Sequence, residues 1–190
     1  MELFSRVRSS VTGLVVKRLL KSRKRNKKVY NLSTARTIGL IFDGTNPKNF
    51  DGVYDFYKTL KERNINISIL GYVQPKNIPD NFLIKKNIQF FTTKEVNWYF
   101  KPKNTEALKF ADKKFDILIN LDLNQEKVIN YIVSISLARF KVGRFVKENN
   151  YNDLSIRLDK EPTLEYYIQQ VWHYLELINR PDLRPKFENV

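Results

Sequence analysis

Apolar residues between positions 37 and 178 occur either in short continuous runs or at spacings of three and four. The continuous runs, bounded by turn-forming residues, predict buried strands at 37–42, 66–73, 88–91, 115–121, 140–142 and 154–158. The spaced runs predict helices at about 49–63, 105–112, 128–135 and 162–178. Strands that alternate with helices are typical of a mostly parallel sheet covered by helices on both faces, so we expect one α/β domain.

The N-terminal residues have a different pattern. Apolar residues from Leu3 to Val15 lie at helical spacing, and Lys21–Lys28 then holds six cations in eight positions. Such a run cannot bury itself, and we expect it to be extended or to become ordered only on a partner. The chain is therefore predicted to consist of a basic arm (1–36), the α/β domain (37–178) and an irregular tail (179–190).

The distribution of charge along the chain indicates a function for the N-terminal arm. The net charge is +14, and residues 1–36 hold 11 Lys and Arg against one acidic residue, whereas residues 37–190 hold 23 against 19. A dense cationic arm favours a polyanion such as RNA. Two alternatives are a solvated tail without a partner and a basic helix on an anionic membrane surface. The predicted RNA-binding residues are Arg6, Arg8, Lys17, Arg18, Lys21, Arg23, Lys24, Arg25, Lys27, Lys28, Arg36, Lys101 and Lys103.

Two further groups of residues each allow two interpretations. The segment Trp98–Lys103 places aromatic rings beside lysines, which suits stacking on bases, although such rings more often pack beneath their own loop. Asp43 and Asp122 follow predicted strands, at the edge of a parallel sheet where ligand sites form. Carboxylates at strand ends more often serve turns and helix caps, and this is the interpretation that we favour.

Several classes of function are excluded or disfavoured. The chain has no cysteine and a single histidine, His173, so thiolate chemistry and sites with Cys or several His ligands are excluded. Neither a glycine-rich phosphate-binding motif nor a nucleophile elbow is present. We therefore expect no enzyme activity, metal, cofactor or small-molecule substrate. No apolar run has the length of a membrane span or a signal peptide, which favours a cytoplasmic protein with no membrane partner.

Part of the chain resembles a known enzyme fold. Phe115–Asp122, together with Ala138–Arg144, is similar to the first domain of heptosyltransferase-type glycosyltransferases. The resemblance implies a single Rossmann-like topology. These enzymes need a second nucleotide-sugar domain, for which this chain has no room. At most it implies a degenerate nucleotide-sugar-binding domain, with Asp43, Asn46 and Asp122 near the ligand.

A second resemblance covers more of the chain. The basic arm, Thr37–Asp43 and Phe115–Arg144 resemble a small α/β family from Bacteroidetes-type bacteria that includes a lineage-specific ribosomal protein of the large subunit. The resemblance implies a structural, non-catalytic protein that binds ribosomal RNA and contacts neighbouring ribosomal proteins. Its arm would make sequence-independent contacts with phosphates.

Overall fold

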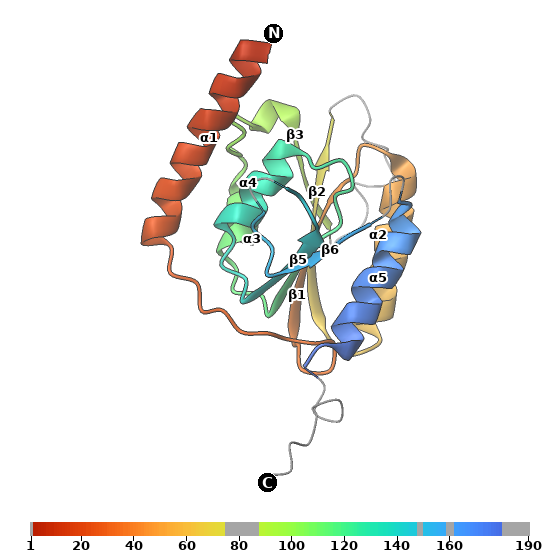
Figure 1. The fold of residues 1–190 in the computed structure, drawn as a ribbon. Coiled ribbons are helices and arrows are strands. Elements are labelled where there is room, and N and C mark those ends of the chain that lie inside the picture. Colours follow the sequence, from red (N-terminus) through yellow and green to blue (C-terminus); the bar gives the residue numbers. More distant parts are fainter. Residues whose placement is uncertain (1, 75–87, 148–149, 159–161, 180–190) are drawn as a thin grey trace.

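The computed structural model describes residues 2–74, 88–147, 150–158 and 162–179. Its centre is a six-stranded sheet in the order β3-β2-β1-β4-β5-β6, and every neighbouring pair is parallel (Figure 1). The strands are β1 (Thr37–Asp43), β2 (Asn66–Val73), β3 (Ile88–Thr92), β4 (Ile117–Asn120), β5 (Phe140–Arg144) and β6 (Leu154–Ile156). The order reverses between β1 and β4, as in Rossmann-like folds. The predicted α/β class is confirmed, and the described strands are parallel throughout.

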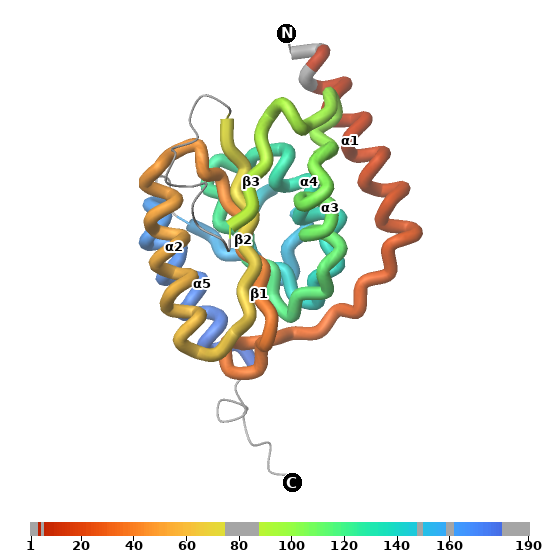
Figure 2. Tube along the Cα trace, turned by 180° about the vertical axis from the view of Figure 1, so that it is seen from behind, coloured from red at the N-terminus to blue at the C-terminus, as the bar shows by residue number. Residues whose placement is uncertain are grey.

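Helices cover both faces of the sheet (Figures 1 and 2). One face carries α2 (Pro47–Lys61) and α5 (Leu164–Leu177), which share a core with residues of β1, β4 and β5. The other face carries α3 (Thr105–Asp112) and α4 (Lys127–Ile135), and α1 (Glu2–Ser22) packs on the outside of α4. The result is a three-layer sandwich with one additional helix.

Local sequence explains where these helices begin and how deeply they lie. Asn46 caps α2 by accepting a hydrogen bond from the Lys48 backbone, and Pro47 occupies the first turn, where no backbone N–H is needed. In α4 every residue from Tyr131 to Ile135 is buried. A helix that is apolar around its circumference needs cover on two sides. The sheet supplies one side, and α1 supplies part of the other.

An extended segment that we call the strap, residues 23–36, joins α1 to β1 and runs along the lower end of the sheet in Figure 1. The Lys28 backbone N–H donates to Arg139 O, one residue before β5, and the Leu32 N–H donates to Leu175 O in α5. Tyr30, Leu32 and Ala35 are buried in the core shared with α2 and α5. The boundary at residue 37 therefore divides the charge of the chain, whereas the hydrophobic core extends across it.

Asp116 fixes the last residues of the strap. Its carboxylate accepts hydrogen bonds from the backbone N–H groups of Arg36 and Thr37 and pairs with Arg139. Burial alone would raise the pKa of Asp116, but these hydrogen bonds and the charge of Arg139 outweigh it and hold the pKa below its usual value. Within the basic run, Lys21 and Ser22 end α1, whereas residues 23–28 are extended, as predicted, and are ordered against their own chain.

Other differences from the sequence prediction are small. The strand expected at 154–158 ends at Ile156. The segment 92–104, for which the sequence predicts no helix or strand, contains a 3₁₀ turn (η2, Thr93–Glu95) and an isolated bridge between Val96 and Pro102. The predicted tail lies outside the described residues from position 180 onward.

Candidate nucleic-acid interface

Five cationic side chains on α1 and the strap, named at the end of this paragraph, face solvent. None of these five lies within ion-pair distance of a carboxylate in the described part of the chain. Lys17, Arg18 and Lys21 are neighbours on the helix surface because they are three or four residues apart. Cations that are crowded without counter-charges repel one another, and a polyanion relieves this repulsion. We call this group the basic face, and it comprises Lys17, Arg18, Lys21, Lys24 and Lys28.

Three more of the predicted RNA-binding cations contact carboxylates of the domain. The Arg23 guanidinium pairs with Asp112. The Arg25 Nη2 donates to both carboxylate oxygens of Asp153, at 2.5 and 2.6 Å. Lys27 lies 3.5 Å from the same carboxylate, and its side chain is 73% exposed. Arg23 and Arg25 therefore hold the strap in place, whereas Lys27 remains accessible to a ligand.

The aromatic loop packs partly against α1. The Arg8 guanidinium lies 3.7 Å from the centroid of the Phe100 ring, and the Thr12 hydroxyl donates to Tyr99 O. Trp98, by contrast, is 51% exposed. Packing, the more common role for such rings, therefore accounts for Tyr99 and Phe100 and leaves Trp98 in contact with solvent. Of the other predicted RNA-binding residues, Lys101 is half-buried, and the exposed ones are Arg6, Arg36 and Lys103.

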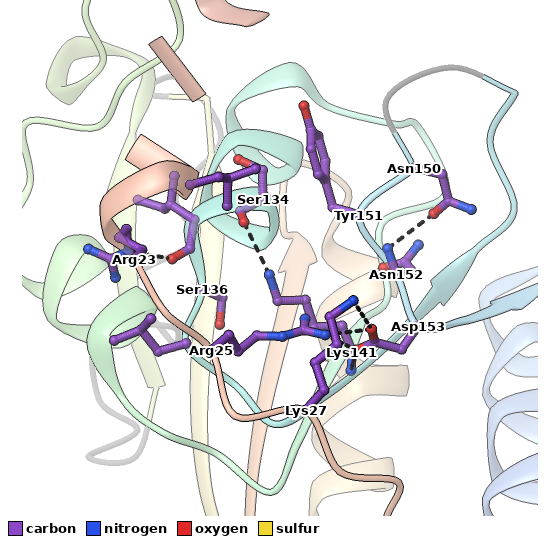
Figure 3. Close-up of a pocket in the computed structure, with 13 residues that line it drawn as sticks. Arg23, Arg25, Lys27, Ser134, Ser136, Lys141, Asn150, Tyr151, Asn152 and Asp153 are labelled. Atoms are coloured by element: carbon purple, nitrogen blue, oxygen red, sulfur yellow. Dashed lines mark hydrogen bonds and ion pairs between the residues drawn. The ribbon is translucent and has the colours of Figure 1, made fainter. Parts of the chain in front are cut away.

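A cavity of about 380 Å³ lies beneath the strap (Figure 3). The end of α4, strand β5 and residues 150–153 form its walls together with the strap. The charged groups that line it are Arg23, Arg25, Lys27, Lys141 and Asp153. The structure thus brings three strap cations together with a lysine more than 110 residues later in the chain, a proximity that sequence reasoning did not predict.

Lys141 is 3% exposed and belongs to β5. Its ammonium donates to Val133 O at 2.6 Å and to Ser134 O at 3.1 Å, which are carbonyls at the end of α4. Burial, together with the charges of the neighbouring Arg25, Lys27 and Arg23, lowers the pKa of Lys141 to about 7, and the charge of Asp153 opposes this shift. The signal in the sequence is a lysine in the middle of a buried strand, between Phe140 and Val142.

The carboxylates at the strand ends serve turns. Asp43 accepts hydrogen bonds from the Thr45 backbone and from the Asn124 side chain, and Asp122 accepts from the backbones of Asn124 and Glu126. These contacts lie beyond the carboxyl ends of β1 and β4, the two strands between which the strand order reverses. The turn-and-cap interpretation is therefore confirmed. Asn46 likewise caps α2, and His173 lies exposed on α5.

The buried state of Asp122 predicts a pH effect on stability. Burial and, to a smaller extent, the charge of Asp43 raise its pKa from the usual 3.8 to about 7, against the opposing effect of the two backbone hydrogen bonds. A carboxyl group whose pKa is raised by folding stabilises the fold fully below pH 3.8, and the contribution is lost as pH rises through about 7. Between pH 4 and pH 7, the free energy of unfolding of the wild type should therefore fall by up to about 4 kcal/mol more than that of Asp122→Asn.

Urea unfolding of both proteins at each pH measures this difference, because the other titrating groups are common to both. Asp55→Asn, at an exposed position on α2, is the matched control and should follow the wild type. Parallel profiles for the wild type and Asp122→Asn would show that Asp122 is ionised throughout.

The parallel sheet in the order 3-2-1-4-5-6, together with the basic face, defines an α/β protein of Rossmann-like fold with a polycationic surface. The chain belongs to a family of unknown function, DUF6913, whose model matches residues 10–178. The matched region includes the strap and most of α1, so the family model also crosses the charge boundary. No curated protein and no solved structure matches the chain.

Two kinds of feature are absent from the described residues. None of the helices in this part of the chain combines the length and the apolar character that a membrane span requires. The same residues contain no cluster of His, Asp and Glu side chains suited to a metal ion.

Proposed function

We propose that the protein is a cytoplasmic, structural component of the large ribosomal subunit that binds ribosomal RNA through the basic face. The observation that carries this proposal is the set of exposed cations without carboxylate partners among the described residues. Dense cations without counter-charges fit phosphate contacts, which position a protein on RNA without reading its sequence.

The rest of the molecule supports a non-catalytic role. At the strand ends where Rossmann-like enzymes bind their ligands, Asp43 and Asp122 make hydrogen bonds with the protein's own turns. The α/β domain then serves as a rigid body that fixes the strap and α1. In this role it contacts RNA on one side and neighbouring ribosomal proteins elsewhere.

One observation favours a second candidate function. Apolar side chains on α1 face solvent, with Phe4 66%, Val7 48% and Leu14 67% exposed. Together with the cations of α1, they have the composition of a helix that lies on an anionic membrane. In the ribosomal proposal, the same side chains contact a neighbouring protein.

Sedimentation of native lysate through a sucrose gradient tests the ribosomal proposal. The wild type is compared with a variant in which four exposed cations become glutamine: Lys17, Arg18, Lys21 and Lys24. We expect the wild type to migrate with the large subunit at low salt and this basic-face variant to remain at the top. The matched control replaces four exposed lysines elsewhere and should migrate like the wild type: Lys48, Lys61, Lys94 and Lys114.

Wild-type protein found only at the top of the gradient at low salt would overturn the ribosomal proposal. Binding to anionic vesicles, measured by flotation, then tests the membrane candidate. Loss of flotation in Leu14→Gln would support insertion of α1 into the membrane surface, because the exposed Leu14 side chain contributes nothing to the described core.

A further inference from the structure

We propose that the cavity beneath the strap is a binding site for a phosphate group, held by Lys141, Arg25 and Lys27. A water molecule occupies about 30 Å³ in the liquid, so a cavity of about 380 Å³ has room for a phosphate group and several waters. The site is part of the folded body and is distinct from the exposed cations of the basic face.

Charge balance is the first argument. Four cationic side chains line the cavity, and Asp153 is the acidic side chain among its lining residues (Figure 3). The carboxylate that pairs with Arg23, Asp112, does not line it. The lining therefore carries a net positive charge. A bound dianion would neutralise most of this charge in a partly enclosed space, where electrostatic interactions are stronger than in water.

Available donors are the second argument. In its charged form Lys141 has three N–H donors, of which two donate to carbonyls and the third has no acceptor among the described residues. Arg25 contacts Asp153 through Nη2, which leaves Nε and Nη1 without a partner in the described part of the chain. The Ser136 hydroxyl accepts from the Ala138 backbone, and its own hydrogen donates to no described residue. Several donors converging from different elements suit a tetrahedral anion with many acceptor oxygens.

The charge state of Lys141 should respond to a bound anion. Neighbouring cations and burial both disfavour its charged form, and an anion between these groups would restore it. Anion binding should therefore raise the pKa of Lys141 and take up a proton when the solution lies above pH 7. A lysine that only capped α4 would show no such coupling.

Phosphate can come from two sources. The first is the backbone of the RNA that the basic face binds, because Lys24 and Lys28 belong to the same strap as the cavity residues. In that form the inference rests on the proposed function. The second source is a free phosphorylated small molecule, and in that form the site is independent of RNA.

Calorimetric titration of the full chain at pH 8 tests the site. The probes are inorganic phosphate and sulfate, with chloride at matched ionic strength as the reference. Sulfate does not titrate near this pH, so proton uptake, measured in two buffers of different ionisation enthalpy, comes from the protein. We expect both anions to bind wild type with uptake of up to one proton. Lys141→Met should abolish both signals, and the exposed-site control Lys94→Met should keep them.

A second variant keeps the test valid if Lys141→Met fails to fold. Lys27 is largely exposed and makes only a long contact with Asp153, so Lys27→Gln should fold normally and bind sulfate severalfold more weakly. Heats equal to those of chloride in wild type would overturn the inference, as would sulfate binding by Lys141→Met with wild-type affinity.

RNA titrations distinguish the two sources and separate this inference from the proposed function. If RNA backbone enters the cavity, sulfate competes with RNA and Lys141→Met lowers RNA affinity. If a free ligand enters, RNA affinity is the same in both proteins while sulfate binding differs. Sulfate binding without any RNA binding would overturn the proposed function and support the cavity as a site for a free phosphorylated ligand.

Discussion

Removal of residues 1–36 is expected to unfold the α/β domain instead of leaving it intact without its arm. The strap contributes Tyr30, Leu32 and Ala35 to the core. Truncation of a buried leucine to alanine costs about 2–5 kcal/mol and that of a large aromatic residue about 3–5 kcal/mol. Their combined loss is comparable to the total stability of a domain, about 5–15 kcal/mol.

A shorter deletion, residues 1–22, is the matched control. It removes α1, which contributes Val16 to the core and packs Val15 and Leu19 against it. We expect this protein to retain a cooperative urea transition, followed by circular dichroism, at a lower midpoint than wild type. A protein beginning at residue 37 that unfolds cooperatively at the wild-type midpoint would show that the strap only lies on the surface.

The basic-face variant should lose most of its affinity for RNA. Each phosphate contact contributes about 0.7–0.9 to the slope of log affinity against log salt concentration, so losing four contacts makes the slope shallower by about 3. At 0.1 M salt this corresponds to a loss of about 10³-fold. The four side chains are exposed and form no ion pair with described residues, so folding should be unaffected.

Fluorescence anisotropy with structured RNA over a range of salt concentrations measures both quantities. The control variant at Lys48, Lys61, Lys94 and Lys114 removes the same charge from other surfaces and should keep the wild-type slope. Equal losses in both variants would mean that affinity follows net charge alone and that the basic face has no special position.

The sequence predicted the elements of the fold well because each one carries its own periodicity. The apolar run of β1 and the spaced apolar residues of α2 require no knowledge of their neighbours. The order of the strands and the position of the strap depend on contacts between distant residues, such as Arg25 with Asp153. Composition alone makes such a strap look like a free arm, because paired and unpaired arginines are identical in sequence.

The candidate site was predictable to the same extent. Density of charge identified the exposed cations, such as Lys17 and Lys21, without any structure. The cavity was not predictable, because it forms only when the strap crosses in front of β5. Lys141 was the one local signal, because it stands between two apolar residues of a predicted strand and lysines are rarely buried unless they are paired.

The path of the strap also sets an order of events during synthesis. Leu32 pairs with Leu175, and Asn31 donates to Ile178 O, so the strap cannot be fixed until almost the whole described chain has been made. At about 5–20 residues per second, the ribosome needs roughly 7–30 s to cover the intervening 146 positions. For part of that interval the strap has been made and the residues that carry its carboxylate partners, Asp112 and Asp153, have not. In a nascent chain of this protein, the cationic strap is therefore accessible to nucleic acid before the domain has folded.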